Sequence, residues 1–202
     1  EHSERITQEL SSICDVRIIW GGNQTIETIR KASLPPRAIE MAFADRHSIA
    51  VIDSDEYLEK DADEIAKGFY TDTYYTDQNA CSSPRLVVWT GNNVNEAREK
   101  FWTTLCEMVK SKYEMKPIQA VDKYTSMCML GMGHEGAKLV SDDNYVVRVE
   151  VDKLYPELMD YKNGGGYFFE YVAQNLDEIV PVLTKQCQTI SVLGVSKQQV
   201  KE

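Results

Sequence analysis

Cysteine thiols are the side chains of this chain best suited to nucleophilic chemistry, and Cys81 has the most informative surroundings of the five. A helical pattern precedes Cys81 and the apolar run Leu86–Trp89 follows it, which predicts a helix–turn–strand corner. The thiolate is the reactive form of cysteine, and backbone N–H groups at such a corner can lower the pKa of the thiol. The competing interpretation is a small buried apolar residue, which is the commoner role of an isolated cysteine.

Glu40 is the second candidate, because it is the one charged residue in the apolar strand pattern Ala38–Ala42. A carboxylate in such a strand is costly unless it is exposed or paired. Burial would raise its pKa toward the range of a general base. A surface residue on an edge strand explains Glu40 equally well.

Gly21 and Gly22 end one strand pattern and open a helical pattern. Such a turn exposes backbone N–H groups at a helix N-terminus, where a phosphate group is stabilised. Two glycines form a weak motif, and a simple tight turn explains them as well.

Metal sites, disulfide frameworks and thiol hydrolases are disfavoured by the cysteine and histidine pattern. The five cysteines are odd in number, and no pair has the spacing of a zinc motif. Reduced thiols in a cytoplasm are the simplest explanation. The three histidines are scattered, and His134, the one histidine after Cys81, has no evident orienting partner.

Charge and length restrict the remaining classes of function. The net charge of −10 disfavours a nucleic acid or an anionic membrane as the main partner. No apolar run approaches the roughly 18 residues that span a bilayer. The 202 residues can form one large domain, or one domain and part of another.

Strand and helix patterns alternate along the chain, which is typical of an α/β layered fold. Helices are expected at residues 3–12, 25–31, 55–71, 95–113, 118–130 and 176–186. Strands are expected at residues 15–20, 38–42, 48–52, 85–90, 137–140, 145–151, 167–172 and 189–195.

In this order the patterns resemble the second half of an aldehyde dehydrogenase superfamily protein. In that superfamily a strand and small-residue turn contact the cofactor, a later strand carries a catalytic glutamate, and a helix then leads to the nucleophilic cysteine. The finer detail resembles the fatty acyl-CoA reductases of the bacterial bioluminescence type (LuxC-like). That resemblance rests on Trp20-Gly21-Gly22, Asp77-Gln78-Asn79-Ala80-Cys81-Ser82 and Gln188-Thr189-Ile190-Ser191.

The resemblance implies a fold and a set of site residues. Residues 38–202 would form a three-layer α/β/α catalytic domain, and residues 1–37 the last strand and helix of a Rossmann-type cofactor domain. Cys81 would carry the acyl group and Glu40 would carry its proton. The residues expected to contact the cofactor, NADPH, are Trp20, Gly21, Gly22 and Met41.

The same resemblance implies that a long-chain acyl-CoA, or another acyl thioester, is reduced to a fatty aldehyde. An acyl-transferring partner protein and a homo-oligomer are compatible with it. Two alternatives stay open: a CoA-acylating or aldehyde-oxidising dehydrogenase of the same superfamily, and a non-catalytic scaffold domain in which Cys81 is a core residue.

Some family features are missing from this sequence. Met41–Ala44 stands where ordinary aldehyde dehydrogenases have Leu-Gly-Gly-Lys. The glutamate motif that holds the nicotinamide ribose has no clean counterpart near Gly164–Phe169. The N-terminal half of such an enzyme is also missing, so we expect these 202 residues to be an excised piece that does not turn over by itself.

Overall fold

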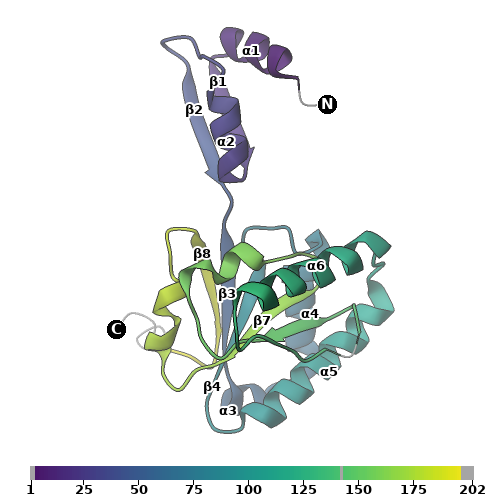
Figure 1. Cartoon of the computed structure of the whole chain (residues 1–202). Coiled ribbons are helices and arrows are strands. Elements are labelled where there is room, and N and C mark those ends of the chain that lie inside the picture. Colours follow the sequence, from purple (N-terminus) through teal and green to yellow (C-terminus); the bar gives the residue numbers. More distant parts are fainter. Residues whose placement is uncertain (1–2, 142, 197–202) are drawn as a thin grey trace. The chain divides into compact units, whose positions relative to one another are not determined.

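The chain forms two compact units, Glu1–Arg46 and His47–Glu202, in a computed structural model that describes residues 3–141 and 143–196 (Figure 1). The predicted domain division at residues 37 and 38 is displaced, because the strand expected at 38–42 belongs with the first unit. That strand pairs with the first strand of the chain. The identity of the two units as cofactor and catalytic parts stays a prediction.

The first unit is a strand–turn–helix–strand motif that is preceded by a helix. Its elements are α1 (Glu4–Ile13), β1 (Val16–Gly21), α2 (Asn23–Arg30) and β2 (Ile39–Ala44). Strands β1 and β2 pair in parallel, with Arg17 opposite Glu40 and Trp20 opposite Phe43. The turn and helix predicted after the first strand are confirmed.

A six-stranded sheet forms the centre of the second unit. Its order is β5-β6-β7-β4-β3-β8, and each neighbouring pair is parallel except β5 with β6. The strands are β3 (His47–Asp53), β4 (Pro84–Thr90), β5 (Lys138–Leu139), β6 (Val147–Glu150), β7 (Tyr167–Val172) and β8 (Cys187–Leu193). Since the central strands β3, β4 and β7 are covered on both faces, most of their residues are apolar and buried.

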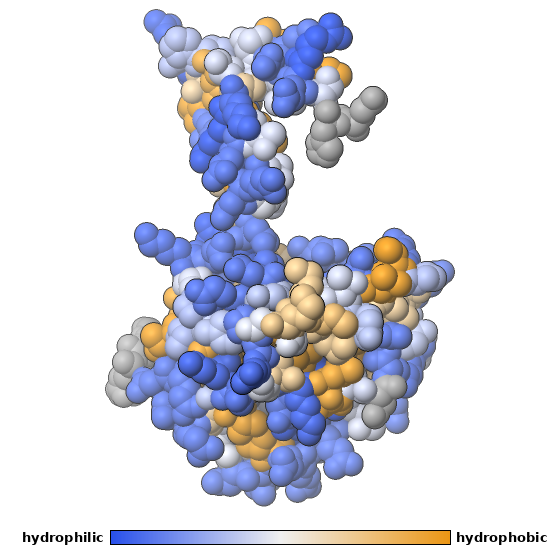
Figure 2. Space-filling view, viewed as in Figure 1, coloured by the Kyte–Doolittle hydropathy of each residue, from blue (hydrophilic) through white to orange (hydrophobic). Residues whose placement is uncertain are grey.

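Helices cover both faces of this sheet, so the unit has three layers. One face packs on α3 (Ser54–Leu58), α4 (Ala62–Thr73) and α5 (Val94–Lys112). The other packs on α6 (Pro117–Gly133) and the 3₁₀ helices η2 (Pro156–Tyr161) and η3 (Leu176–Val182). Hydrophilic residues dominate the visible surface (Figure 2), and two clusters of buried apolar side chains form the core layers on the two faces of the sheet. No helix in the described ranges is long and apolar enough to cross a membrane.

Two helix predictions need correction. The single helix expected at residues 55–71 is two helices, because Asp53 and Asp61 each cap a new N-terminus. The Asp61 carboxylate accepts the N–H groups of Asp63 and Glu64, and such a cap begins a helix. The helix expected at 176–186 is a 3₁₀ helix that contains Pro181, which has no N–H to continue an α-helix.

Phe101 of α5 offers a test of the core beneath this sheet. Its ring is fully buried and contacts the rings of Tyr57, Phe69 and Trp102. We expect Phe101→Ala to lower the free energy of unfolding by about 3–5 kcal/mol, because it leaves a cavity. Urea unfolding followed by circular dichroism measures this change. The exposed Tyr75 is the control, and an equal loss in Tyr75→Ala would contradict the assignment.

Candidate functional site

Cys81 lies in a corner between a 3₁₀ turn, η1 (Tyr74–Thr76), and strand β4, so the predicted helix–turn–strand corner is confirmed. Its side chain is half-buried. The backbone carbonyl of Cys81 accepts a hydrogen bond of 2.7 Å from the buried Ser48 hydroxyl on β3. Within the described residues, the backbone N–H of Cys81 donates to no protein acceptor. The corner therefore joins a thiol to an N–H group that a developing negative charge can use.

We call the residues of this corner, 77–83, the Cys81 loop. The side chain of Gln78 holds this loop to the sheet. Gln78 is fully buried. Its Nε2 donates to the carbonyls of Pro84 and Tyr167, at 2.9 and 3.0 Å. Its Oε1 accepts the N–H groups of Gly166 and Tyr167, both at 3.0 Å. Only an amide side chain supplies two donors and such an acceptor, so this position requires asparagine or glutamine chemistry.

Asp77 and Gln78 have left-handed backbone conformations, with φ of 51° and 59°. Residues with side chains seldom adopt that region, so their surroundings must hold them there. The Asp77 carbonyl accepts the N–H of Gly165 at 2.9 Å, and its carboxylate accepts the Tyr113 hydroxyl at 2.6 Å. A Cβ atom on Gly164 would lie 2.7 Å from the Asp77 carbonyl oxygen. The glycines at 164–166 therefore permit close packing against the Cys81 loop, a role that the sequence did not reveal.

Two other cysteines have surroundings that disfavour the thiolate. Burial is the main cause that raises the pKa of Cys106, and the nearby Asp143 carboxylate adds to it. Burial also raises the pKa of Cys187. A raised thiol pKa lowers the fraction of reactive thiolate at neutral pH.

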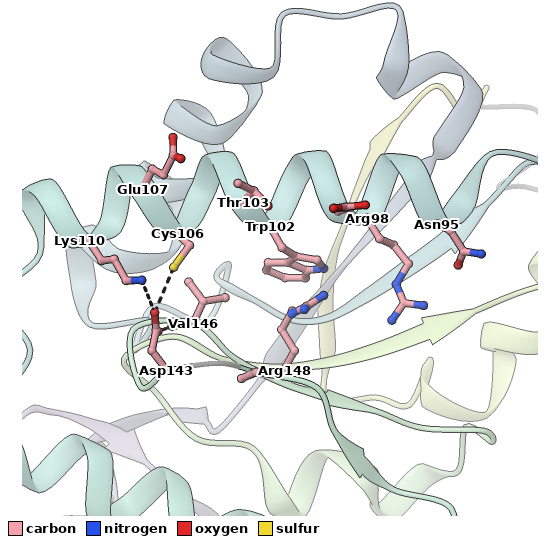
Figure 3. Close-up of a pocket in the computed structure, with 12 residues that line it drawn as sticks. Asn95, Arg98, Trp102, Thr103, Cys106, Glu107, Lys110, Asp143, Val146 and Arg148 are labelled. Carbon is pink, nitrogen blue, oxygen red and sulfur yellow. Dashed lines mark hydrogen bonds and ion pairs between the residues drawn. The ribbon is translucent and has the colours of Figure 1, made fainter.

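Cys106 lines a pocket of about 530 Å³ along α5, and no residue of the Cys81 loop lines it (Figure 3). The cationic groups that line this pocket are already paired within the protein. Lys110 pairs with Asp143, and Arg98 pairs with Glu170 of β7. We therefore place the candidate active site at Cys81 and not in this pocket.

The predicted cofactor residues lie at one face and one end of the two-stranded sheet in the first unit. Trp20 and Met41 are exposed on the same face, and the Trp20 ring stacks on Phe43 with centroids 4.9 Å apart. Gly22 is the N-cap of α2, and no side chain caps the first N–H groups of this helix. A flat apolar face and free N–H groups fit the aromatic and phosphate parts of a dinucleotide.

Glu40 lies on the opposite face of this sheet, so the structure does not bring it together with Trp20 and Met41. Its carboxylate accepts from Arg17 Nε at 2.9 Å and from Arg30 Nε at 2.6 Å. Hydrogen bonds from Arg30 and then Arg17 lower the pKa of Glu40. The expectation that burial raises the pKa of Glu40 is therefore wrong, because pairing with two guanidinium groups outweighs desolvation.

This pairing makes the stability of the first unit depend on pH. A carboxyl group with a lowered pKa in the folded state contributes stability above its unfolded pKa, about 4.5, and loses it as the pH falls further. We expect Glu40→Gln to melt at a lower temperature than the wild type at neutral pH, and the difference to shrink toward about pH 3. Thermal unfolding from neutral to acidic pH measures this difference.

Glu27, an exposed residue of the same helix as Arg30, provides the control for this measurement. Glu27→Gln should leave the melting temperature almost unchanged at neutral pH. A Glu40→Gln variant that melts like the wild type at neutral pH would show that the pair does not stabilise the fold.

The Gln78 hydrogen bonds predict a cost when this amide is removed. We expect Gln78→Ala to lower the free energy of unfolding by roughly 3 kcal/mol, because buried backbone groups lose their partners. Urea unfolding measures the loss, and the exposed Gln174 provides a matched glutamine-to-alanine control. Equal stabilities of Gln78→Ala and Gln174→Ala would contradict the role of Gln78.

The described ranges contain no group of three or more histidine, cysteine, aspartate or glutamate side chains that could hold a metal ion.

Comparison with known proteins places these features in context. A sequence profile of the family described as "Acyl-CoA reductase (LuxC)" matches residues 1–130. A "Long-chain acyl-protein thioester reductase" of Aliivibrio fischeri is 33% identical over 95 residues, which are 46% of this chain and 19% of the relative. The protein of the same description from Vibrio harveyi is 30% identical over 141 residues, which are 68% of this chain and 28% of the relative. The matched segments thus span less than a third of each curated relative.

Solved structures with the same fold are aldehyde dehydrogenases. An NAD-dependent aldehyde dehydrogenase from Sinorhizobium meliloti has a TM-score of 0.66 and 11% identity, over 98% of this chain and 43% of that structure. An NAD-dependent benzaldehyde dehydrogenase from Corynebacterium glutamicum has a TM-score of 0.64 and 10% identity, over 98% of this chain and 46% of that structure. These similarities confirm the aldehyde dehydrogenase-like fold that the sequence predicted.

Proposed function

Because the chain belongs to the acyl-CoA reductase (LuxC) family, we propose that the whole protein reduces a long-chain acyl thioester to a fatty aldehyde, with Cys81 as the nucleophile. The observation that carries the proposal is the half-buried Cys81 thiol beside an N–H group that donates to no acceptor among the described residues, on a loop that Gln78 holds to the sheet. The descriptions of the two curated relatives support an acyl thioester substrate. The acyl donor is a CoA thioester or the thioester of an acyl-transferring partner protein.

The first step is acyl transfer to Cys81. The Sγ atom attacks the carbonyl carbon of the thioester, the donor thiol leaves, and an S-acyl cysteine forms. The Cys81 N–H can stabilise the negative charge that develops on the carbonyl oxygen. Gln78 holds the loop to the sheet and Asp77 holds it to Gly165 and Tyr113, which keeps the backbone N–H of Cys81 in place beside the thiol. Such fixed positioning lowers the barrier to reaction.

The reduction needs a hydride, which NADPH supplies when it is bound. Trp20 and Met41 would lie against the cofactor, and the free N–H groups after Gly21 and Gly22 would hold a phosphate. After reduction, the Cys81 sulfur leaves as thiolate when the aldehyde is released. The choice of NADPH over NADH is part of the proposal and is carried over from the resemblance to the family.

Glu40 is proposed as the proton carrier for Cys81. Arg17 and Arg30 keep its carboxylate ionised, which is the form that accepts a proton. The same pairs weaken it as a base, so accepting a proton requires that Glu40 release at least one arginine.

Substitution of Cys81 in the full-length protein tests the proposal. After incubation with a long-chain acyl-CoA, we expect intact-mass and peptide mass spectrometry to find the acyl group on Cys81. Cys81→Ser should abolish the thioester adduct and the formation of aldehyde, because a serine hydroxyl is a much weaker nucleophile at neutral pH. The exposed Cys128 is the control, and Cys128→Ser should retain both. An undiminished thioester adduct in Cys81→Ser would overturn the assignment.

Aldehyde oxidation is a second candidate, favoured by the structural similarity to NAD-dependent aldehyde dehydrogenases. Rates of acyl-CoA reduction and aldehyde oxidation, measured on the same full-length preparation, separate the two activities. A non-catalytic scaffold would show neither activity, and its Cys81 would resist iodoacetamide as a buried thiol does.

A further inference from the structure

Lys123 of α6 is a buried lysine without an acidic partner in contact. Its side chain is 1% exposed and, within the described residues, makes no ion pair. The Nζ atom donates to the carbonyl of Gly165 at 2.7 Å and to the carbonyl of Asn144. The Met115 sulfur lies 3.7 Å from it. Burying an ammonium group destabilises a fold unless hydrogen bonds or an opposite charge compensate for the lost hydration.

Burial lowers the pKa of Lys123 to about 8, and the Asp143 carboxylate opposes this shift. The side chain therefore changes between ammonium and amine near neutral to mildly basic pH. Either form retains enough N–H groups to serve both carbonyls. The contacts of Lys123 thus do not depend on its charge.

Gly165 connects Lys123 to the Cys81 loop. The Gly165 carbonyl accepts from Lys123, and the N–H of the same residue donates to the Asp77 carbonyl at 2.9 Å. The next N–H group, that of Gly166, donates to the Gln78 side chain. Lys123 therefore lies on one side of a glycine turn (residues 164–166) and the Cys81 loop on the other.

The glycine turn has little conformational restriction of its own. Gly165 and Gly166 have φ of 63° and 89°, and glycine populates such conformations together with many others. A donor at a fixed place on a helix restricts this freedom. Lys123 is that donor, because α6 holds its backbone and Asn144 holds the same Nζ atom from a second segment.

We propose that Lys123 is a positioning residue for Cys81, which holds the Gly165 carbonyl and so keeps the glycine turn in the conformation that supports Asp77 and Gln78. The role in acyl transfer rests on the proposed function of Cys81. The effect on the mobility of the loop does not.

Lys110 provides a matched control on the second segment. It pairs with Asp143 (Figure 3), the residue before Asn144 in the sequence, but it makes no hydrogen bond to Gly165 within the described residues. A lysine-to-methionine change at either position thus removes one contact to the 143–145 segment. Only the change at Lys123 also removes the contact to the glycine turn.

Hydrogen–deuterium exchange on the full-length protein, followed by mass spectrometry of peptides, tests the proposal. In Lys123→Met we expect amide exchange to accelerate about tenfold or more at residues 164–167 and 77–83, while strand β3 exchanges as in the wild type. Lys110→Met should leave both loops unchanged. If Lys123→Met does not fold, Lys123→Gln, which keeps an N–H donor, should show a smaller acceleration at the same residues.

Two results would overturn the proposal. One is unchanged exchange at residues 77–83 in a folded Lys123 variant. The other is acceleration of equal size in every peptide, which would mean a general loss of stability.

A kinetic measurement adds a readout specific to positioning. In Lys123→Met the rate of Cys81 acylation at saturating acyl-CoA should fall on the order of 10- to 100-fold, with little change in KM. A change confined to KM would contradict positioning. If Cys81 is never acylated even in the wild type, the proposed function fails, and the exchange result still decides the contact between Lys123 and the loop.

Discussion

The buried amide of Gln78 is the interaction on which the candidate site depends. It joins the Cys81 loop to the start of β4 and to the start of β7. A buried amide that lost these partners would carry the full cost of desolvation. Because all of these bonds form together only in one arrangement, Gln78 selects a single conformation of the loop. These hydrogen bonds offset the conformational energy of the left-handed backbone at Asp77 and Gln78.

The carboxylates of Glu170 and Glu40 are likewise held by several hydrogen-bond donors each. Glu170 of β7 is fully buried, and its carboxylate accepts from the indole N–H groups of Trp89 and Trp102 and from Arg98. Glu40 has two arginine partners in the first unit. Cys81 differs from these groups, because its backbone N–H donates to no acceptor among the described residues. The acyl transfer proposed for Cys81 needs such a donor, because the negative charge that develops on the carbonyl oxygen has to be stabilised.

Residue patterns predicted most elements, and the failures have physical causes. Apolar periodicity placed the buried strands well, since both faces of a parallel sheet demand apolar residues. It missed the break between α3 and α4, because the cap of Asp61 acts on backbone N–H groups and leaves the apolar spacing unchanged. For Glu40 the apolar strand suggested burial. Arg17 and Arg30 lie 23 and 10 residues away in sequence, and only folding brings them to the carboxylate.

Residue types alone determined which groups of this chain are candidates for chemistry: a thiol in a specific motif, a carboxylate in a strand and glycines that open a helix. They also determined the alternation of strands and helices, since local hydrophobic spacing reports which face of each element is buried. The tertiary structure decided which groups support the thiol. Gln78, the glycine turn and Lys123 meet across intervals of about 40 to 90 residues, and no local pattern records such a contact. Such hydrogen bonds depend on which distant segments lie side by side, and only the folded sheet determines that.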